Sequence, residues 1–441
     1  MNRLRPHTED YPEVRRKGRP APVAMGTLMN APRPGFLKQP DRLRDVGLSS
    51  RVLVAAGALG VSWLAGCASS ISTGQSATMA APVATVAPAV SRAVSDSVRA
   101  VIDRAIADSA FPGAYAVVGT REGIIAEYGA GRLDADDATR PTSETIWDLA
   151  SLTKVIGTTS AMLQLVGSGK VVLDSPVVRY LPEWTGRGAD KVSVRQLLSH
   201  NSGLQAGRLF YKEAATADEA FQQLFATAPD TAPGVRYTYS DIGFLLLGRL
   251  VARVSGEKLD AYDAAHIFGP LGMRDTRYLP PTSWLPRIAP TEQDPWRGRK
   301  VRGEVHDENA HRMGGVVGHA GLFSSARDLS RFARMYLNYG QLDGARVFDS
   351  ATVVTFTRLQ NPAISHRALG WEKPNGTNSA GKNMSPSAFG HTGFTGTSIW
   401  MDPEQNLFVL LLTNRVNPTR ENRKIGNVRT GLADAVVGAL H

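Results

Sequence analysis

Residues 150–155 read ASLTKV and place a serine, Ser151, three residues before a lysine, Lys154. On a helix this spacing is about one turn, so the hydroxyl and the amine lie on one face within reach of each other. A helix is expected here because apolar residues recur at helical spacing over 151–168 and Gly169 supplies a stop. A neutral lysine so placed can take the serine proton while the hydroxyl attacks a carbonyl. Backbone N–H groups at the start of the helix can stabilise the negative charge that then develops.

The same four-residue pattern occurs twice more, so the motif alone is weak evidence. Ser255 and Lys258 lie at a helix end beside a glycine, and Ser379 and Lys382 lie in a loop rich in Gly, Asn and Ser. Only Ser151 opens an amphipathic helix directly after a strand-like run, TIWDLA. The placement therefore favours Ser151 as the candidate nucleophile.

Two further polar motifs follow along the chain. Tyr239, Ser240 and Asp241 stand at the N-terminus of an apolar helix expected over 241–255, where Ser and Asp are common caps. The sequence His-Thr-Gly at 391–393 is expected at the head of a strand. Each motif is common in proteins by itself, so only the three together, in this order, indicate a function.

In the order Ser-x-x-Lys, Tyr-x-Asp and His-Thr-Gly, the motifs resemble the set carried by serine β-lactamases and penicillin-binding proteins. The resemblance covers residues 93–440 and is closest to the branch that holds class C β-lactamases, D-alanyl-D-alanine carboxypeptidases, D-aminopeptidases and related esterases. The segments VSVRQLLSHNSGL (192–204), FGPLGMRDTRY (268–278) and GGVVGHAGLFSSARDLSRFA (314–333) are also similar to that family. The chain has no Gly-x-Ser-x-Gly motif, which argues against an α/β-hydrolase.

This resemblance implies an α+β fold of the β-lactamase and transpeptidase type, in which helices flank an antiparallel sheet and the site lies beside an all-helical lobe. It also implies an acyl-enzyme mechanism that uses no metal and no organic cofactor. Ser151 would be the nucleophile, Lys154 its general base, and Tyr239 a second proton carrier that serves the leaving group. The oxyanion hole would consist of the backbone N–H groups of Ser151 and Phe394. The residues expected to bind substrate are Asp241, His391, Thr392, Gly393 and Phe394.

Two departures from the β-lactamase pattern bear on the substrate. His391 stands where class C β-lactamases carry lysine, although the resembling carboxypeptidases and D-aminopeptidases also carry histidine there. Because an ordinary histidine titrates near pH 6.5, its grip on a substrate carboxylate is expected to depend on pH. Asp241 stands where the branch has asparagine, and its charge would repel a carboxylate and favour a neutral or amine-bearing substrate. Both changes point away from an efficient β-lactamase.

The expected function is that of a serine hydrolase acting on an ester or on a D-amino-acid peptide or amide. A class C-like β-lactamase is the alternative within the family. The alternative from another class is a non-catalytic envelope lipoprotein that binds peptidoglycan. The presence of Ser151, Lys154 and Tyr239 argues against this last alternative, because a site without activity has no reason to keep all three.

A His- and acid-rich segment, VHDENAHRMGGVVGHAG, raises the question of a metal site. Its candidate ligands are His306, Asp307, Glu308 and His319. It lacks a helical His-x-x-x-His arrangement, so we expect a loop that lines or braces the site and no bound metal.

The formal net charge of +10 would suit a nucleic-acid-binding protein, but its distribution argues against one. Residues 1–66 hold eleven Lys or Arg and five acidic residues, which leaves a net charge of +4 for residues 67–441. We therefore expect a small-molecule or peptide substrate and no nucleic-acid partner.

The stretch 52–67, VLVAAGALGVSWLAGC, ends at the only cysteine of the chain, Cys67. Its apolar run is short for a transmembrane helix, which needs about 20 residues, and suits a signal peptide. Because LAGC resembles a bacterial lipobox, we expect Cys67 to be lipidated and to anchor the protein in the cell envelope, facing the periplasm or the outside. The expected organisation is an N-terminal extension with a lipoprotein signal peptide (1–66), a flexible Ala-, Ser-, Thr- and Pro-rich tether (67–90) and a hydrolase domain (91–441).

The apolar patterns place strands at both ends of this domain. The runs GAYAVVGT and GIIAEYGAG predict a hairpin that turns at 121–123, and TSIWMDPEQNLFVLLLTNR predicts a second one that turns at 402–403. Further helices are expected from residue 91 onward and over 216–227, 241–255, 326–338 and 427–440. We therefore predict one sheet built from the two ends of the domain, a helical middle as a second lobe, and a cleft between them.

Overall fold

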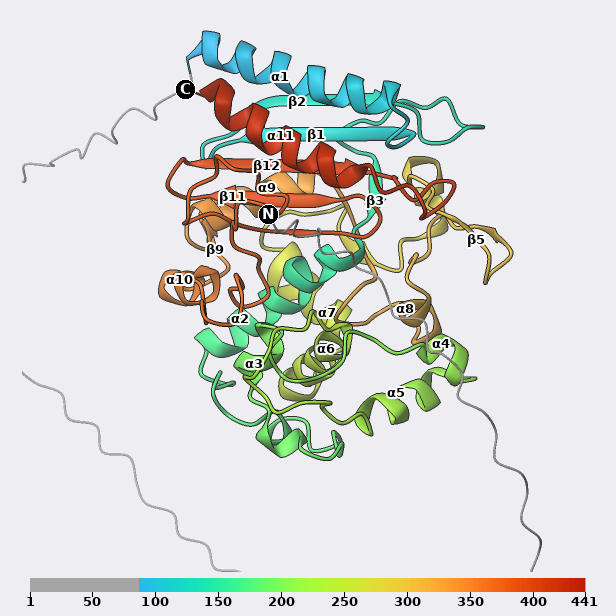
Figure 1. Ribbon diagram of the computed structural model, residues 1–441, viewed down its shortest axis with the longest axis vertical. Helices are drawn as coiled ribbons and strands as arrows, with labels where there is room; N and C mark the ends of the chain where they lie inside the picture. The colour runs from blue at the N-terminus through green and yellow to red at the C-terminus, as the bar shows by residue number, and fades with distance from the viewer. Residues whose placement is uncertain (1–86, 441) are drawn as a thin grey trace, which may run out of the picture. The chain divides into compact units, whose positions relative to one another are not determined.

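A computed structural model describes residues 87–440 (Figure 1). The predicted signal peptide, Cys67 and most of the predicted tether lie outside these residues. The first described element is helix α1 (Pro88–Ala107), which begins slightly before the expected boundary at residue 91. Within 87–440, every helix is too short or too polar to cross a membrane.

The central unit is a five-stranded antiparallel sheet with the strand order β10-β11-β12-β1-β2. Its strands are β1 (Gly113–Gly119), β2 (Ile124–Gly131), β10 (Phe389–Thr392), β11 (Ser398–Asp402) and β12 (Leu407–Thr413). Both predicted hairpins are present, as β1-β2 and β11-β12. Pairing of β1 with β12 places Tyr115 opposite Leu412 and joins the two ends of the domain. The prediction of one sheet built from both ends is therefore confirmed.

Helices cover both faces of this sheet, which explains why its central strands are apolar without alternation. Helix α1 and helix α11 (Ile425–Leu440) lie side by side on one face, where they pack on Ala114 and Val118 of β1. Helix α9 (Ala326–Leu337) covers the other face and packs with Val117. Alternate residues of one strand thus belong to two separate hydrophobic cores.

The middle of the chain is mainly helical and forms the lower part of Figure 1. Its longest helix, α6 (Asp241–Ser255), begins where the Ser240 hydroxyl accepts the Gly243 N–H and ends at Gly256. The other helices are α2 (Ser160–Gly167), α3 (Val194–Leu198), α4 (Phe210–Glu213), α5 (Ala217–Phe225), α7 (Leu259–Asp263), α8 (Glu308–Arg312) and α10 (Ser350–Thr357). The four helices predicted over 216–227, 241–255, 326–338 and 427–440 are confirmed to within two residues at each end.

A second, three-stranded antiparallel sheet has the order β3-β7-β4 and leads into the Ser-x-x-Lys segment. Its strands are β3 (Ile146–Asp148), β7 (Leu322–Ser325) and β4 (Arg277–Tyr278), and two small hairpins pair β5 (Gln293–Asp294) with β6 (Arg299–Lys300) and β8 (Gln341–Leu342) with β9 (Ala345–Arg346). Just beyond β3, the Leu149 N–H donates to the Leu322 carbonyl at 2.9 Å. This contact fixes the backbone two residues before Ser151.

The single α-helix predicted over 151–168 is wrong in its first half. Residues Ala150–Leu152 form a 3₁₀ turn and Lys154–Thr159 form a π-helical turn, so regular α-helix begins only with α2. All six residues of the π-helical turn are buried, so packing on every side sets its backbone. Single π turns inside helices are frequent at functional sites.

Candidate active site

Ser151 and Lys154 lie together just after β3. The Lys154 Nζ atom is 2.9 Å from Ser151 Oγ, so the structure brings together the two groups that the spacing placed on one face. Ser151 is partly exposed, whereas Lys154 is completely buried. The hydroxyl can therefore meet a substrate while the amine stays shielded from water.

Three oxygen atoms surround the Lys154 amine. The Asp241 carboxylate lies 2.7 Å away, the His319 carbonyl lies 3.1 Å away, and Ser151 Oγ is the third. The His319 carbonyl accepts one N–H of the amine, and the Asp241 carboxylate forms an ion pair with it. The remaining position then holds an N–H when the amine is charged and a lone pair when it is neutral. The proton that Lys154 gains or loses thus lies on the side of the serine hydroxyl.

Asp148 fixes the backbone turn that precedes the nucleophile. One of its carboxylate oxygens accepts the Ala150 N–H at 2.8 Å, and the other accepts the His306 N–H at 2.6 Å. The turn needs this support because Ala150 has φ = 46°, in the left-handed region that non-glycine residues rarely adopt. Burial raises the pKa of Asp148, and the contacts with His306 and Ala150 work against that shift. Asp148 was not among the site residues predicted from the sequence, and its one visible signal is its place at the end of a strand-like run.

Tyr239 lies beside the same amine, in the segment that precedes α6. Its ring centroid is 4.9 Å from Lys154 Nζ, 4.6 Å from the His200 ring and 5.9 Å from the His391 ring. The Nδ1 atom of His200 accepts the Ser240 backbone N–H at 3.0 Å. Burial lowers the pKa of His200 well below its usual value, so this ring is neutral and carries its proton on Nε2. His200 was missed as a site residue, although it lies in one of the segments that resemble the family.

The His-Thr-Gly triplet follows a strand of its own and does not open the next one. His391 and Thr392 are the last residues of β10, opposite Ile399 and Ser398 of β11, and Gly393 begins the turn between the two strands. The prediction that the triplet heads a strand was therefore wrong. The reason is that β10 has four residues, FGHT, too few to show a strand pattern.

The turn after β10 packs against the backbone that leads to Ser151. The Thr397 hydroxyl donates to the Leu149 carbonyl at 3.1 Å. Glycine is required at position 393 by this close approach, because a Cβ on Gly393 would lie 2.4 Å from the same Leu149 oxygen. The two backbone segments that carry the N–H groups of Ser151 and Phe394 therefore adjoin.

His391 is a buried neutral ring and not a cation. Its Nδ1 lies 2.8 Å from the Thr392 carbonyl, and since a carbonyl oxygen only accepts, Nδ1 carries the proton. Burial, reinforced by the charges of Arg367 and Lys154, lowers the pKa of His391 well below its usual value. Nε2 is thus a hydrogen-bond acceptor, and it has no partner within residues 87–440. The expectation of a pH-dependent cation here was wrong, because it took the imidazole to be exposed to water.

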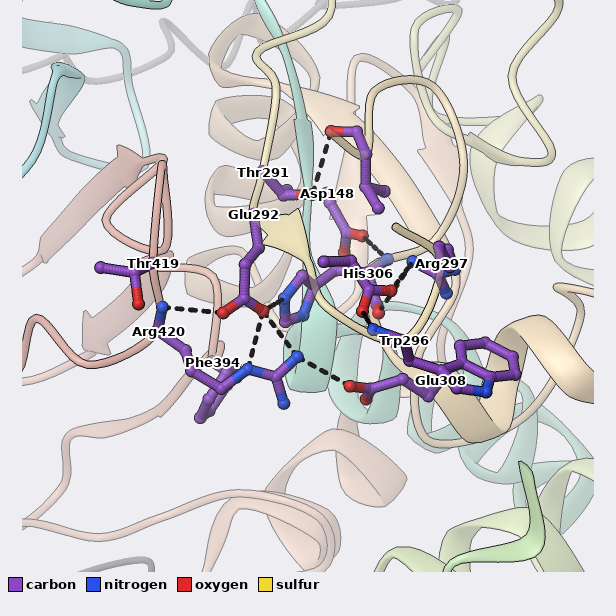
Figure 2. A network of polar contacts seen from close by, with 12 residues as sticks. Asp148, Thr291, Glu292, Trp296, Arg297, His306, Glu308, Phe394, Thr419 and Arg420 are labelled. Carbon is purple, nitrogen blue, oxygen red and sulfur yellow. Dashed lines mark hydrogen bonds and ion pairs between the residues drawn. The ribbon is translucent and has the colours of Figure 1, made fainter. Parts of the chain in front are cut away.

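Charged side chains hold Phe394 in place (Figure 2). Its ring stacks on His306 with 5.7 Å between centroids, and the Arg415 guanidinium lies 4.4 Å from the ring while its Nε donates to the Phe394 carbonyl at 2.7 Å. His306 in turn contacts Glu292 at 2.8 Å, and Arg420 donates to the same carboxylate at 2.7 Å. Burial alone would raise the pKa of Glu292, but these two hydrogen bonds lower it to about 2, so Glu292 is ionised.

The polar side chains of the His- and acid-rich segment contact one another or a neighbouring arginine. The His319 ring lies 3.0 Å from Asp307, and Glu308 pairs with Arg420 at 2.7 Å. Burial would raise the pKa of Asp307, but the neighbouring His319 outweighs it and the pKa is lowered. In the described part of the chain, no group of three or more His, Cys, Asp or Glu side chains is arranged to hold a metal ion. Because the His319 carbonyl also holds Lys154, this segment braces the site.

Comparisons with known proteins agree with these motifs. The model of the Beta-lactamase family matches residues 98–431. The chain is 36% identical over 355 residues to an N-acetylmuramyl-L-alanine amidase of Bacillus subtilis (strain 168), across 71% of this chain and 79% of that protein. It is 33% identical over 320 residues to a Salmonella schwarzengrund (strain CVM19633) protein named "Putative D-alanyl-D-alanine carboxypeptidase", across 65% of this chain and 73% of that protein.

Solved structures show the same fold at lower identity. A penicillin-binding protein homologue from Caulobacter crescentus superposes with a TM-score of 0.66 and 21% identity, over 81% of this chain and 99% of that one. A family VIII carboxylesterase superposes with a TM-score of 0.64 and 21% identity, with the same coverage. The predicted α+β fold of the β-lactamase and transpeptidase type is thereby confirmed. Since the family model matches more than half of the sequence and the two relatives exceed 30% identity, the chain belongs to the beta-lactamase family and is a serine hydrolase of that family.

Proposed function

We propose that this chain is a cell-envelope hydrolase that cleaves an ester or a D-amino-acid peptide or amide through an acyl-enzyme. The observation that carries the proposal is the 2.9 Å contact between Ser151 Oγ and Lys154 Nζ, with Tyr239 beside it. Relatives named as an amidase and a D-alanyl-D-alanine carboxypeptidase support hydrolysis of amide bonds in cell-wall material.

In the first half of the proposed reaction, Ser151 Oγ attacks the carbonyl carbon of the substrate. The neutral Lys154 amine accepts the serine proton as the new bond forms, while the His319 carbonyl accepts one of its N–H groups and the Asp241 carboxylate lies 2.7 Å from it. Negative charge develops on the substrate oxygen. The backbone N–H groups of Ser151 and Phe394 stabilise that charge.

Collapse of this intermediate breaks the bond to the leaving group and leaves an ester on Ser151. The leaving alcohol or amine takes a proton from Tyr239, which regains one from Lys154, so the serine proton ends on the leaving group. Water then attacks the ester, and one of its protons returns to Ser151 by the reverse path. One water is consumed and a carboxylic acid is released.

The charges beside the nucleophile do not favour a substrate carboxylate. His391 is neutral and its Nε2 is buried, and the Asp241 charge is compensated by Lys154 at 2.7 Å. A β-lactam carboxylate would meet neither the lysine cation of class C β-lactamases nor a charged histidine at position 391. This pattern supports an ester or a D-aminoacyl amide over a β-lactam.

The experiment compares Ser151→Ala with Ser255→Ala, a matched control that alters a second Ser-x-x-Lys serine. We expect the wild type and the control to hydrolyse p-nitrophenyl esters or D-aminoacyl amides and to be labelled by a fluorophosphonate. Folded Ser151→Ala should do neither. Unchanged hydrolysis by Ser151→Ala would overturn the mechanism, and no labelling of the wild type would favour a peptidoglycan-binding lipoprotein. Nitrocefin turnover that equals ester turnover would favour a β-lactamase.

Lipid anchoring through Cys67 is part of the same proposal, supported by the lipobox-like sequence LAGC at 64–67. Cells that express the full chain with radiolabelled palmitate should yield a labelled, membrane-bound protein. Cys67→Ser should lose both the label and the membrane fraction. Equal labelling of the two proteins would contradict the anchor without touching the catalytic proposal.

A further inference from the structure

A buried arginine lies beside the candidate proton carrier. Arg367 is 6% exposed, and its guanidinium carbon lies 5.3 Å from the Tyr239 ring centroid and 5.4 Å from that of Tyr237. Its Nε donates to the Tyr237 hydroxyl at 3.1 Å, and its Nη2 donates to Glu372 at 2.6 Å. Neither the Ser-x-x-Lys spacing nor the family motifs point to this residue.

The third guanidinium nitrogen of Arg367, Nη1, lacks within residues 87–440 the acceptor that the other two nitrogens have. Nη1 is buried and has no hydrogen-bond acceptor among the described residues. A guanidinium removed from water normally pairs with acceptors on all sides, because burial of an unpaired charge is costly. Here part of the positive charge faces two aromatic rings, an arrangement that electrostatic attraction to the ring faces stabilises.

The surroundings of Tyr239 are otherwise balanced in charge. Its titratable and charged neighbours are Lys154 from the π-helical turn, His200 after α3, Tyr237 and Asp241 on either side of it, Arg367 with Glu372 from the loop before β10, and His391 from β10. The two histidines are neutral, and Lys154 is paired with Asp241. Arg367, paired with Glu372 at 2.6 Å, is therefore the permanent cation next to the ring, whereas the charge of Lys154 changes during the reaction.

We propose that Arg367 is a positioning residue that eases proton transfer from Tyr239 to the leaving group. This inference rests on the proposed function. When the Tyr239 hydroxyl gives its proton to the leaving oxygen or nitrogen, the phenolate that remains is stabilised by the guanidinium beside it. The proton that Tyr239 next takes from Lys154 restores the phenol, so no charge accumulates over a turnover.

The test uses two esters of the same acyl group, one with p-nitrophenol and one with a simple alcohol as leaving group. p-Nitrophenolate departs without a proton, whereas an alkoxide needs one. The ratio of kcat/KM for the two esters therefore reports on Tyr239 as a proton donor. We expect Arg367→Met and Arg367→Gln to raise the ratio of p-nitrophenyl to alkyl ester by at least about tenfold, a partial loss of general acid catalysis. Arg367→Lys, which keeps the charge, should restore the ratio toward the wild-type value.

Glu372→Gln is the complementary variant, because it keeps Arg367 and removes the paired carboxylate. Its ratio should equal the wild-type value or fall below it. The inference would be overturned if the Arg367 variants lost kcat/KM equally on both esters, or did not change it. The proposed function would still hold in that case, provided that the wild type is active and Ser151→Ala is inactive. If the neutral Arg367 variants do not fold, a raised ratio in Glu372→Gln would overturn it.

Discussion

The Asp241 carboxylate lies 2.7 Å from the Lys154 amine, so the residue that replaces asparagine in the middle motif binds the candidate general base. The expectation that Asp241 meets the substrate had treated its charge as free. In the structure that charge faces an amine that is completely buried. Asp241 and the His319 carbonyl together leave one direction open for the amine, and that direction is toward Ser151.

The first prediction concerns the acceptor at position 241. Asp241→Asn keeps a polar oxygen beside the Lys154 amine, and we expect its kcat to stay within about tenfold of the wild type. Asp241→Leu removes the acceptor at similar size. It should lower kcat by about 10- to 100-fold, because a polar contact with a charged group contributes about 1.5–3 kcal/mol and holds the amine beside Ser151. Steady-state ester hydrolysis checks both variants, and equal losses would show that the charge matters and the acceptor does not.

The second prediction concerns substrate binding and pH. Since burial lowers the pKa of His391 well below its usual value, the ring stays neutral across the neutral range. KM for a carboxylate-bearing substrate should therefore be flat between about pH 6 and 8. The matched control is the same substrate with its carboxylate converted to an amide. A KM that rises with pH for the acid alone would restore a cationic role for His391.

The third prediction is a loss of stability in acid through His200 and His391. Burial lowers the pKa of both in the folded state, whereas the unfolded chain titrates near 6.5. Below about pH 6.5 the unfolded state therefore binds protons that the folded state does not. The free energy of unfolding should be fully retained above that pH and should fall toward acid by up to about 1.4 kcal/mol per pH unit for each ring.

Urea unfolding between pH 5 and 7.5 measures this slope. His200→Gln and His391→Asn should each reduce this slope by up to about 1.4 kcal/mol per pH unit, the effect of one proton, because each removes one buried titrating group. The exposed His366 supplies the control, since His366→Gln leaves the burial of both rings unchanged. Variants at the two buried positions that keep the full wild-type slope would contradict the assignment.

Local patterns predicted most helices and hairpins well, because these elements depend on the pattern of apolar and turn residues close together in the sequence. The hairpins β1-β2 and β11-β12, helix α6 and the three motifs are of this kind. The contact of Asp148 with His306, that of Arg367 with Tyr239, and the neutral state of His391 depend on residues far apart in the chain. Burial and approach distance arise only when those segments pack together. For the same reason the π-helical turn, buried on all sides, could not be predicted from helical spacing.

The fourth prediction tests Asp148 as the support of the nucleophile turn. Asp148→Asn replaces one accepting oxygen by an amide that faces a backbone N–H, which should cost about 1–3 kcal/mol of stability. Because Ala150 precedes Ser151, kcat should fall together with stability while KM changes less.

Asp402→Asn is a matched control for this variant. Asp402 is buried like Asp148 and accepts the Ser385 N–H at 2.7 Å and its hydroxyl at 2.6 Å, at the end of β11. It should lose similar stability, measured by thermal unfolding, and keep the wild-type kcat at a temperature where it is folded. If kcat fell equally in both variants, the fall would reflect the loss of stability and not the support of the nucleophile turn by Asp148.

The last prediction concerns the close approach of Gly393 to the backbone before the nucleophile. A Cβ at this position would lie 2.1 Å from Thr397 Oγ1 and 2.4 Å from the Leu149 carbonyl oxygen. Gly393→Ala must therefore push the turn away from Leu149 and carry the Phe394 N–H with it. Loss of one oxyanion donor lowers kcat by about 10²–10³-fold, so we expect a fall of that size with little change in KM.

Two further variants separate geometry from the general effect of a methyl group. Gly431→Ala, in helix α11 where a Cβ meets no atom within 4 Å, should leave kcat unchanged and add up to about 1 kcal/mol of stability. Thr397→Ala combined with Gly393→Ala removes the hydroxyl clash and leaves the Leu149 carbonyl in place. Because that oxygen belongs to the main chain and cannot be trimmed, the double variant should stay inactive. Recovery of kcat in it would show that the oxyanion turn does not depend on contact with Leu149.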